Sequence, residues 1–251
     1  AEGRLNSAAG LLEHINANLD DNAVRLGVRL EPPPRDPHLR FRQLIQQAHA
    51  QHGQRVVVLV DEYDKPILDN LTEPAIARQM RDGLRDLYSV IKDNDAHIRF
   101  AFLTGVSKFS KVSIFSGLNN LNDITIDASY SAICGYTDAD VDTVFAPELM
   151  DLDREEIRAW YNGYNWTGTS VYNPFDLLLL FDKREFRPYW FETGTPTFLI
   201  DVLAQRHTFT PDLQQMVAFS SLLSSFDVDH IATEALLWQT GYLTIASQFQ
   251  I

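Results

Sequence analysis

The spacing of hydrophobic residues predicts helices and strands in turn through the first part of the chain. Residues 5–19 carry an apolar residue at every third or fourth position, which is typical of one face of a helix. The apolar residues from Val24 to Leu30 alternate with polar ones instead and predict a strand, after a turn at 20–22. Four prolines between residues 32 and 37 predict a loop. A second helix is expected from residue 41 to about 53.

The most informative pattern is an unbroken apolar run at Val56–Val60. It is too short for a helix and apolar on both faces, which predicts a central strand of a parallel sheet with helices covering both sides. A helix is expected from Ile76 to Ile91, and a second apolar strand over Ile98–Leu103. Together they predict a βαβ unit. A short third strand is expected at 124–126.

From about residue 136 the pattern changes to short helices with clear start signals. These signals are Thr137 with Asp140, Asp153 with Glu156, Asn173-Pro174 and Thr195-Pro196. The first two resemble capping boxes, and each of the others places a capping residue before a proline at the first helical position. We therefore expect an α/β portion at 1–135 and a mostly helical portion at 136–251.

Composition and charge narrow the class of protein. The 251 residues are 45% hydrophobic and 11% aromatic, which excludes a disordered chain. The net charge of −13 argues against a surface built to grip a phosphate backbone, so no nucleic-acid partner is indicated for this chain. No apolar run approaches the ~18 residues of a membrane-spanning helix. The single cysteine, Cys134, cannot form an internal disulfide and favours a cytoplasmic location. We expect it to be a small buried residue rather than a nucleophile.

Two acids follow the first apolar strand, at the end where open α/β sheets bind their ligands. A buried strand ending in Asp61-Glu62 is typical of the Walker B segment of a nucleoside triphosphatase. There the Asp holds Mg²⁺, often through water, and the Glu deprotonates the water that attacks the γ-phosphate. Thr104 ends the second strand, where it could contact the γ-phosphate or that water as a sensor. In the alternative interpretation, the acids form a turn or a helix cap and Thr104 begins a turn at Gly105.

Other site chemistries find less support in the sequence. The phosphate-binding run G-x-x-x-x-G-K-[ST] is absent from the printed sequence, so this chain is expected to bind nucleotide poorly by itself. A restriction-type nuclease needs (D/E)-x-K, but Tyr63 occupies the acidic position before Lys65. Asp64-Lys65-Pro66 is expected to begin a loop instead. Zinc is disfavoured because Cys134 is alone and the seven histidines show no ligand spacing.

Several long and unusual stretches carry a resemblance to a known family. They are VVVLVDEYDKPILDN (56–70), FLTGVSKFSKVSIFSGLNNLNDITID (102–127), ICGYT (133–137), WYNGYNW (160–166), VYNPF (171–175), YWFETGTPTFLI (189–200) and WQTGYLTI (238–245). From about residue 40 to its end, the sequence resembles the bacterial AAA-ATPase-like family, whose members commonly carry a PD-(D/E)XK nuclease-like domain at the C-terminal end. The resemblance implies a P-loop fold of the additional-strand type that uses ATP and Mg²⁺.

The resemblance also assigns roles to residues. Asp61 and Glu62 match the Walker B acids, with Asp61 as the ligand of Mg²⁺ and Glu62 as the catalytic base, and Thr104 matches the sensor position. Ser107, Lys108 and Lys111 lie in a motif typical of the family, without a definite role. Family members begin with a Gly-Lys-Ser segment that is missing here. The chain is therefore expected to be the middle of a longer protein, with a partial P-loop core followed by a helical lid.

Two functions of different classes are compatible with this interpretation. The first is an ATPase core fragment, inactive in isolation, which hydrolyses ATP in the intact protein. The alternative is a nucleotide-responsive switch or protein-interaction module that regulates an attached nuclease-like effector. Direct nuclease action is disfavoured by the failed (D/E)-x-K pattern and the charge of −13. The sequence leaves the oligomeric state open.

Overall fold

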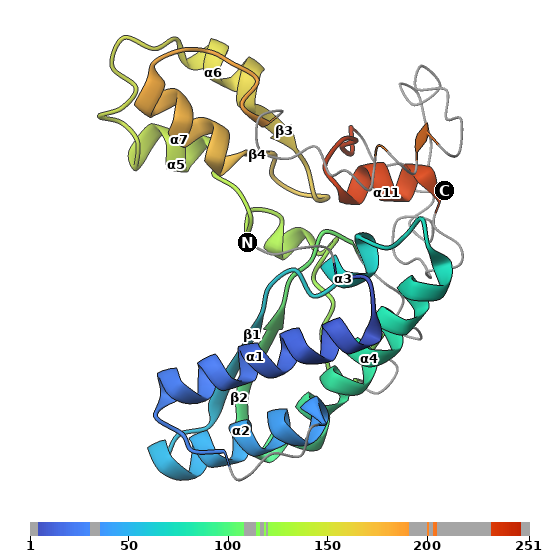
Figure 1. The fold of residues 1–251 in the computed structure, drawn as a ribbon. Helices are drawn as coiled ribbons and strands as arrows, with labels where there is room; N and C mark the ends of the chain where they lie inside the picture. Colours follow the sequence, from blue (N-terminus) through green and yellow to red (C-terminus); the bar gives the residue numbers. More distant parts are fainter. Residues whose placement is uncertain are drawn as a thin grey trace. The chain divides into compact units, whose positions relative to one another are not determined.

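The protein is a mixed α/β chain with a small parallel sheet and several helices (Figure 1). The computed structural model describes residues 5–30, 36–107, 114–115, 118, 120–190, 200, 203–204 and 232–246. The chain divides into two compact units, residues 1–121 with 208–236 and residues 122–207 with 237–251. Within the described residues, no helix is both long and apolar enough to cross a membrane.

Three helices of the first unit pack against one another, α1 (Ala8–Leu26), α2 (Pro37–His52) and α4 (Pro74–Asp93). Helix α2 begins where the Asp36 side chain accepts a hydrogen bond from the His38 amide at 3.0 Å, with a proline at its first position. It ends at Gly53, whose φ of 65° suits a left-handed C-cap. The predicted second helix is thus confirmed.

The strand predicted at Val24–Leu30 is wrong, because helix α1 continues to Leu26 and ends at Gly27, with φ 66°. The buried stripe of this helix runs in steps of four through Leu11, Ile15, Leu19 and Ala23. Asp20, Asp21 and Asn22 lie within the helix and do not form a turn. Tertiary packing of the stripe therefore overrides the weak local preference of these polar residues for turns.

The two predicted strands exist and pair in parallel, β1 (Val56–Val60) with β2 (Ile98–Leu103). Their register pairs Val56 with Ile98 and Val60 with Leu103, with an irregularity between Val56 and Val57. The connection contains the short helix α3 (Lys65–Leu68), helix α4 and the 3₁₀ turn η1 (Asp95–His97). The predicted strand–helix–strand order is confirmed.

Among the described residues, helices cover only one face of this sheet, which differs from the expectation that helices cover both faces. Helix α2 contacts β1, and Val58 is buried at 6% exposure. On the other face Val57, Leu59 and Phe100 are 50%, 70% and 54% exposed. Apolar side chains of a parallel sheet are normally covered on both sides. This face is therefore an exposed apolar surface in the part of the chain that the structure describes.

Residues 124–126 do not form the predicted third strand; they form a turn. The Asp123 side chain accepts a hydrogen bond from the Thr125 amide at 3.1 Å, and the Asp127 amide donates to the Ile124 carbonyl at 3.2 Å. This local bonding replaces pairing with a neighbouring strand. Cys134 is exposed, so its expected buried role is wrong.

The described part of the second unit includes helices and a hairpin. These elements are α5 (Asp138–Thr143), α6 (Arg154–Tyr161), β3 (Asn162–Tyr164), β4 (Val171–Tyr172) and α7 (Pro174–Lys183). Helix α5 begins with the predicted reciprocal capping box, and Asp153 and Asn173 cap α6 and α7. Thr195-Pro196 lies outside the described residues. The helix α11 (Thr233–Gln239) belongs partly to each unit.

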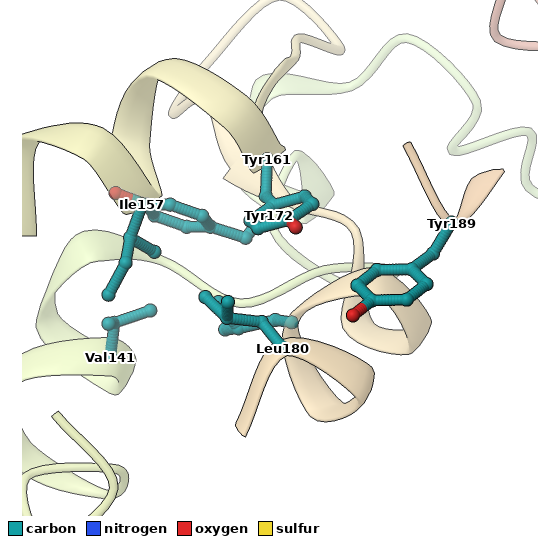
Figure 2. Close-up of a cluster of buried hydrophobic side chains, with 7 residues drawn as sticks. Val141, Ile157, Tyr161, Tyr172, Leu180 and Tyr189 are labelled. Carbon is teal, nitrogen blue, oxygen red and sulfur yellow. The ribbon is translucent and has the colours of Figure 1, made fainter. Parts of the chain in front are cut away.

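The core of the second unit is rich in tyrosine (Figure 2). Its buried members are Val141, Ile157, Tyr161, Tyr172, Leu177, Leu180 and Tyr189. The Tyr172 hydroxyl donates to Asp138 at 2.6 Å, and the Tyr161 hydroxyl donates to the Arg187 carbonyl at 3.0 Å. The hydroxyl of each of these two buried tyrosines therefore has a hydrogen-bond partner, which offsets the cost of removing the hydroxyl from water.

Candidate functional site

The candidate site lies where β1 and β2 end side by side (Figure 1). The backbone pairing extends past the strands, because the Thr104 amide donates to the Val60 carbonyl at 2.8 Å and the Tyr63 amide donates to the Thr104 carbonyl at 2.9 Å. Two parallel strands thus deliver residues 61–63 and Thr104 to the same edge of the sheet. This is the edge where ligands of open α/β sheets bind.

The structure brings Asp61 and Thr104 into direct contact. The Thr104 hydroxyl donates to Oδ1 of Asp61 at 2.5 Å, and the Glu62 amide donates to the same oxygen at 3.0 Å. Asp61 and Glu62 are exposed, whereas Thr104 is half-buried. The contact joins residues 43 positions apart in the sequence. It forms a polar cluster that solvent can reach at the strand ends.

The backbone of Glu62 adopts a conformation that side-chain-bearing residues rarely take. Its φ is 50°, in the left-handed region. Such conformations cost free energy and persist where the surroundings hold them. Here the turn is held by the bond from the Glu62 amide to Asp61 and by the Lys65 amide, which donates to the Glu62 carbonyl at 3.1 Å. The strained residue lies next to Asp61 at the strand end.

The donor atoms at this edge fit a hard cation that keeps most of its water. Asp61 supplies a carboxylate, and the oxygen of Thr104 retains lone pairs when its hydroxyl donates to Asp61. Magnesium is commonly held by one or two carboxylates together with substrate phosphates and water. Among the described residues, no group of three or more His, Cys, Asp or Glu could hold a metal ion.

Asp64 is a member of this region that sequence reasoning missed. Its side chain is fully buried and accepts hydrogen bonds from the Ser107 amide at 2.5 Å and the Val106 amide at 3.2 Å. The Ser107 hydroxyl also donates to it. Burial raises the pKa of the Asp64 carboxyl above its ordinary value, and the bonds from Ser107 and Val106 oppose that rise. The expectation that Asp64 begins a loop is wrong, since helix α3 follows it directly.

Gly105 allows this close approach of the two strand ends. A Cβ at position 105 would lie 2.5 Å from Oδ1 of Asp64 and 2.7 Å from the Tyr63 ring. The hydrogen bonds that Ser107 donates to Asp64 give a structural role to Ser107, one of the three family-motif residues without an assigned role. Lys108 and Lys111 lie outside the described residues.

A family model of known proteins matches the N-terminal part of the chain. Residues 1–115 match the model of the AAA-ATPase-like family, described as predicted AAA-ATPase. This confirms the family resemblance noted in the sequence over residues 40–115, and the matched segment includes β1, β2 and the candidate site. The resemblance of residues 116–251 stays a prediction. The nuclease-like domain stays a prediction.

One relative is similar over nearly all of this chain. It is the "Uncharacterized protein in vnfD 5'region" of Azotobacter chroococcum mcd 1, 67% identical over 243 residues. The match covers 97% of this chain but 47% of that protein. The chain thus spans about half the length of this curated relative. No solved structure matches the chain.

Proposed function

We propose that this chain supplies the metal-binding and water-activating half of an ATP-hydrolysing site in a longer protein. The observation that carries the proposal is the contact of Asp61 with Thr104 at the carboxyl ends of two paired parallel strands, with Glu62 beside it. The match of residues 1–115 to predicted AAA-ATPases supports the same chemistry. The fold would then be part of a P-loop NTPase core, followed by a helical lid.

Each residue of the site has a distinct role in this proposal. Asp61 would hold Mg²⁺, which when bound neutralises charge on the phosphates of ATP. Glu62 would orient the attacking water and accept its proton. The Thr104 hydroxyl would fix the Asp61 carboxylate with its one proton, and its oxygen would accept a hydrogen bond from the attacking water. A bond to the γ-phosphate would require this proton to leave Asp61. The bond from Thr104 to Asp61 gives this positioning role a geometric basis.

The phosphate cradle would come from a segment outside this chain. The printed sequence contains no G-x-x-x-x-G-K-[ST] run. The open face of the sheet, with Val57, Leu59 and Phe100 exposed, supports a sheet that is completed by other parts of the longer protein. The proposed partners are therefore ATP, Mg²⁺ and the remainder of the same protein, with the nuclease-like domain as its effector.

Substitution of the proposed base tests this function in the full-length protein. Glu62→Gln removes the proton acceptor and keeps the size of the side chain, so we expect ATP turnover to fall by at least about 100-fold while ATP still binds. Steady-state phosphate release and nucleotide binding measure the two effects separately.

A matched control is Glu13→Gln, which makes the same chemical change at an exposed position on helix α1. This control should leave turnover and binding unchanged. Full turnover by the Glu62→Gln protein would remove Glu62 from the proposed mechanism. Absence of Mg²⁺-dependent turnover in the unsubstituted full-length protein would refute the ATPase proposal and favour a binding switch.

A further inference from the structure

Asp64 is a buried carboxylate whose position in the fold has no local explanation. It stands at the residue that precedes helix α3, where an aspartate usually caps the helix, yet its side chain makes no capping hydrogen bond. Its bonds go instead to Val106 and Ser107, more than 40 residues away. A side chain that caps a helix bonds to amides within its own first turn. The Asp64 side chain instead connects the segment after β1 with the segment after β2.

Both oxygens of the Asp64 carboxyl accept hydrogen bonds. Oδ1 accepts from the Val106 amide at 3.2 Å, and Oδ2 accepts from both the amide and the hydroxyl of Ser107, the former at 2.5 Å. A buried carboxylate costs several kcal/mol unless it is fully hydrogen-bonded, on the order of the stability of a small domain. The segment 105–107 is thus arranged around this side chain.

Neighbouring contacts reinforce the same connection. The Tyr63 hydroxyl donates to the Ser107 carbonyl at 2.7 Å, and the buried Tyr88 hydroxyl donates to the Tyr63 carbonyl at 3.3 Å. Residues 63 and 64 therefore hold residue 107 through both its amide and its carbonyl. Thr104 lies between this fixed point and the end of β2.

We propose that Asp64 is a positioning residue of the ATP site, which fixes the segment after β2 and so holds the Thr104 hydroxyl on the Asp61 carboxylate. The inference rests on the proposed function. After β1, Asp61 and Asp64 lie on either side of the strained Glu62 and its neighbour Tyr63. After β2, their hydrogen-bond partners Thr104 and Ser107 are separated by the same number of residues. Two parallel cross-links at matching three-residue spacing restrict sliding and rotation of one strand end against the other.

Two substitutions of graded severity test the inference in the full-length protein. Asp64→Asn preserves size and replaces one acceptor oxygen with an NH₂ group, whereas Ser107→Ala removes only the hydroxyl donor. Displacement of reacting groups by about 1 Å can cost 100-fold in rate. We expect kcat to fall by roughly 10- to 100-fold in Asp64→Asn and by less in Ser107→Ala, with KM for ATP within about twofold.

The matched control is Asp95→Asn, at an exposed position in η1. It should leave kcat unchanged. A purely structural role for Asp64 would lower the amount of folded protein and leave kcat per folded molecule unchanged. The split between kcat and KM therefore distinguishes positioning from folding.

Hydrogen exchange on the full-length protein gives a readout that does not depend on ATP hydrolysis. In Asp64→Asn the Val106 and Ser107 amides should exchange at least about tenfold faster, while the α4 amides keep their protection. If the Asp64→Asn protein does not fold, the Ser107→Ala protein provides the test. An unchanged kcat in the Ser107→Ala protein then overturns the inference. Normal kcat and normal exchange in both variants also overturn it. An unsubstituted protein without turnover would instead refute the proposed function.

Discussion

At the scale of single residues, the site depends on how closely two strand ends can approach. Gly105 provides the space, because Asp64 and the Tyr63 ring occupy the volume that a Cβ would need. Asp64 in turn binds the chain two residues further on, at Ser107. Gly105 and the buried Asp64 thus together determine how closely the strand ends approach, although neither has the metal-binding role proposed for Asp61.

Gly105→Ala should destabilise the chain through this steric conflict. The added methyl would meet Asp64 at 2.5 Å, so one strand end must shift, and we expect a loss of about 2 to 3 kcal/mol in the free energy of unfolding. Urea unfolding of the chain measures this loss.

Gly53→Ala is the matched control for this substitution. Nothing lies within 4 Å of a Cβ at position 53, and its φ of 65° adds a backbone cost of about 1 kcal/mol. Equal losses in the two variants would contradict the close approach at Gly105.

Residue-scale prediction from the sequence succeeded where a residue follows a strong local pattern. Asp61 and Thr104 were expected at strand ends, and the structure places them in contact. Asp64 could not be found in this way, because Asp64 and Ser107 both lie beyond the strand ends, where no periodicity fixes their positions. The one available signal was an acid before Lys-Pro that could have capped a helix.

At the scale of elements, the predictions were accurate for segments with a dominant periodicity. The run Val56–Val60 and the stripe of α4 leave little choice of secondary structure. Val24–Leu30 and 124–126 were wrong because an alternation over a few residues also occurs at a helix end or in a turn. In both cases packing or side-chain capping decided the outcome.

The first turn of α7 carries a buried acid that should make stability depend on pH. Asp176 is 1% exposed, and among the described residues its Oδ1 has no hydrogen-bond partner. Burial raises its pKa from 3.8 to about 6. Between these values the folded chain keeps a proton that the unfolded chain has lost, so stability falls as pH rises and stays reduced above pH 6.

Asp176→Asn should remove this dependence and increase the free energy of unfolding at pH 7 by roughly 1 to 3 kcal/mol. Denaturant unfolding at pH 4.5 and pH 7 of both proteins measures the difference. Asp182→Asn, at an exposed position on the same helix, is the control and should retain the unsubstituted pH profile. A variant at Asp176 with an unaltered profile would contradict the burial argument.

At the scale of the whole molecule, the chain contains a candidate site without a phosphate cradle. Its sequence matches predicted AAA-ATPases over residues 1–115, and it covers 47% of a relative's length. The boundary near residue 135 and the role of the helical portion as a lid remain proposals about the longer protein. Charge is a weak guide at this scale, because −13 describes 251 residues and not the longer protein.

The isolated chain should therefore hydrolyse ATP negligibly. The phosphates of ATP need backbone amides and a lysine that the printed sequence does not supply in a P-loop arrangement. Phosphate release by the purified 251-residue chain, compared with the full-length protein at equal molar concentration, measures this. Robust turnover by the isolated chain that is lost in Glu62→Gln would show that the site is complete without a P-loop segment.

The most direct test of the central claim is the identity of the nucleotide on the full-length protein after a single turnover. Protein in excess is mixed with labelled ATP and Mg²⁺, quenched over time, and the bound ADP and ATP are separated. The unsubstituted protein should convert its ATP to ADP, whereas Glu62→Gln should retain ATP over the same period. Conversion at equal rates in the two proteins would contradict the assignment of β1 and β2 as the hydrolytic edge.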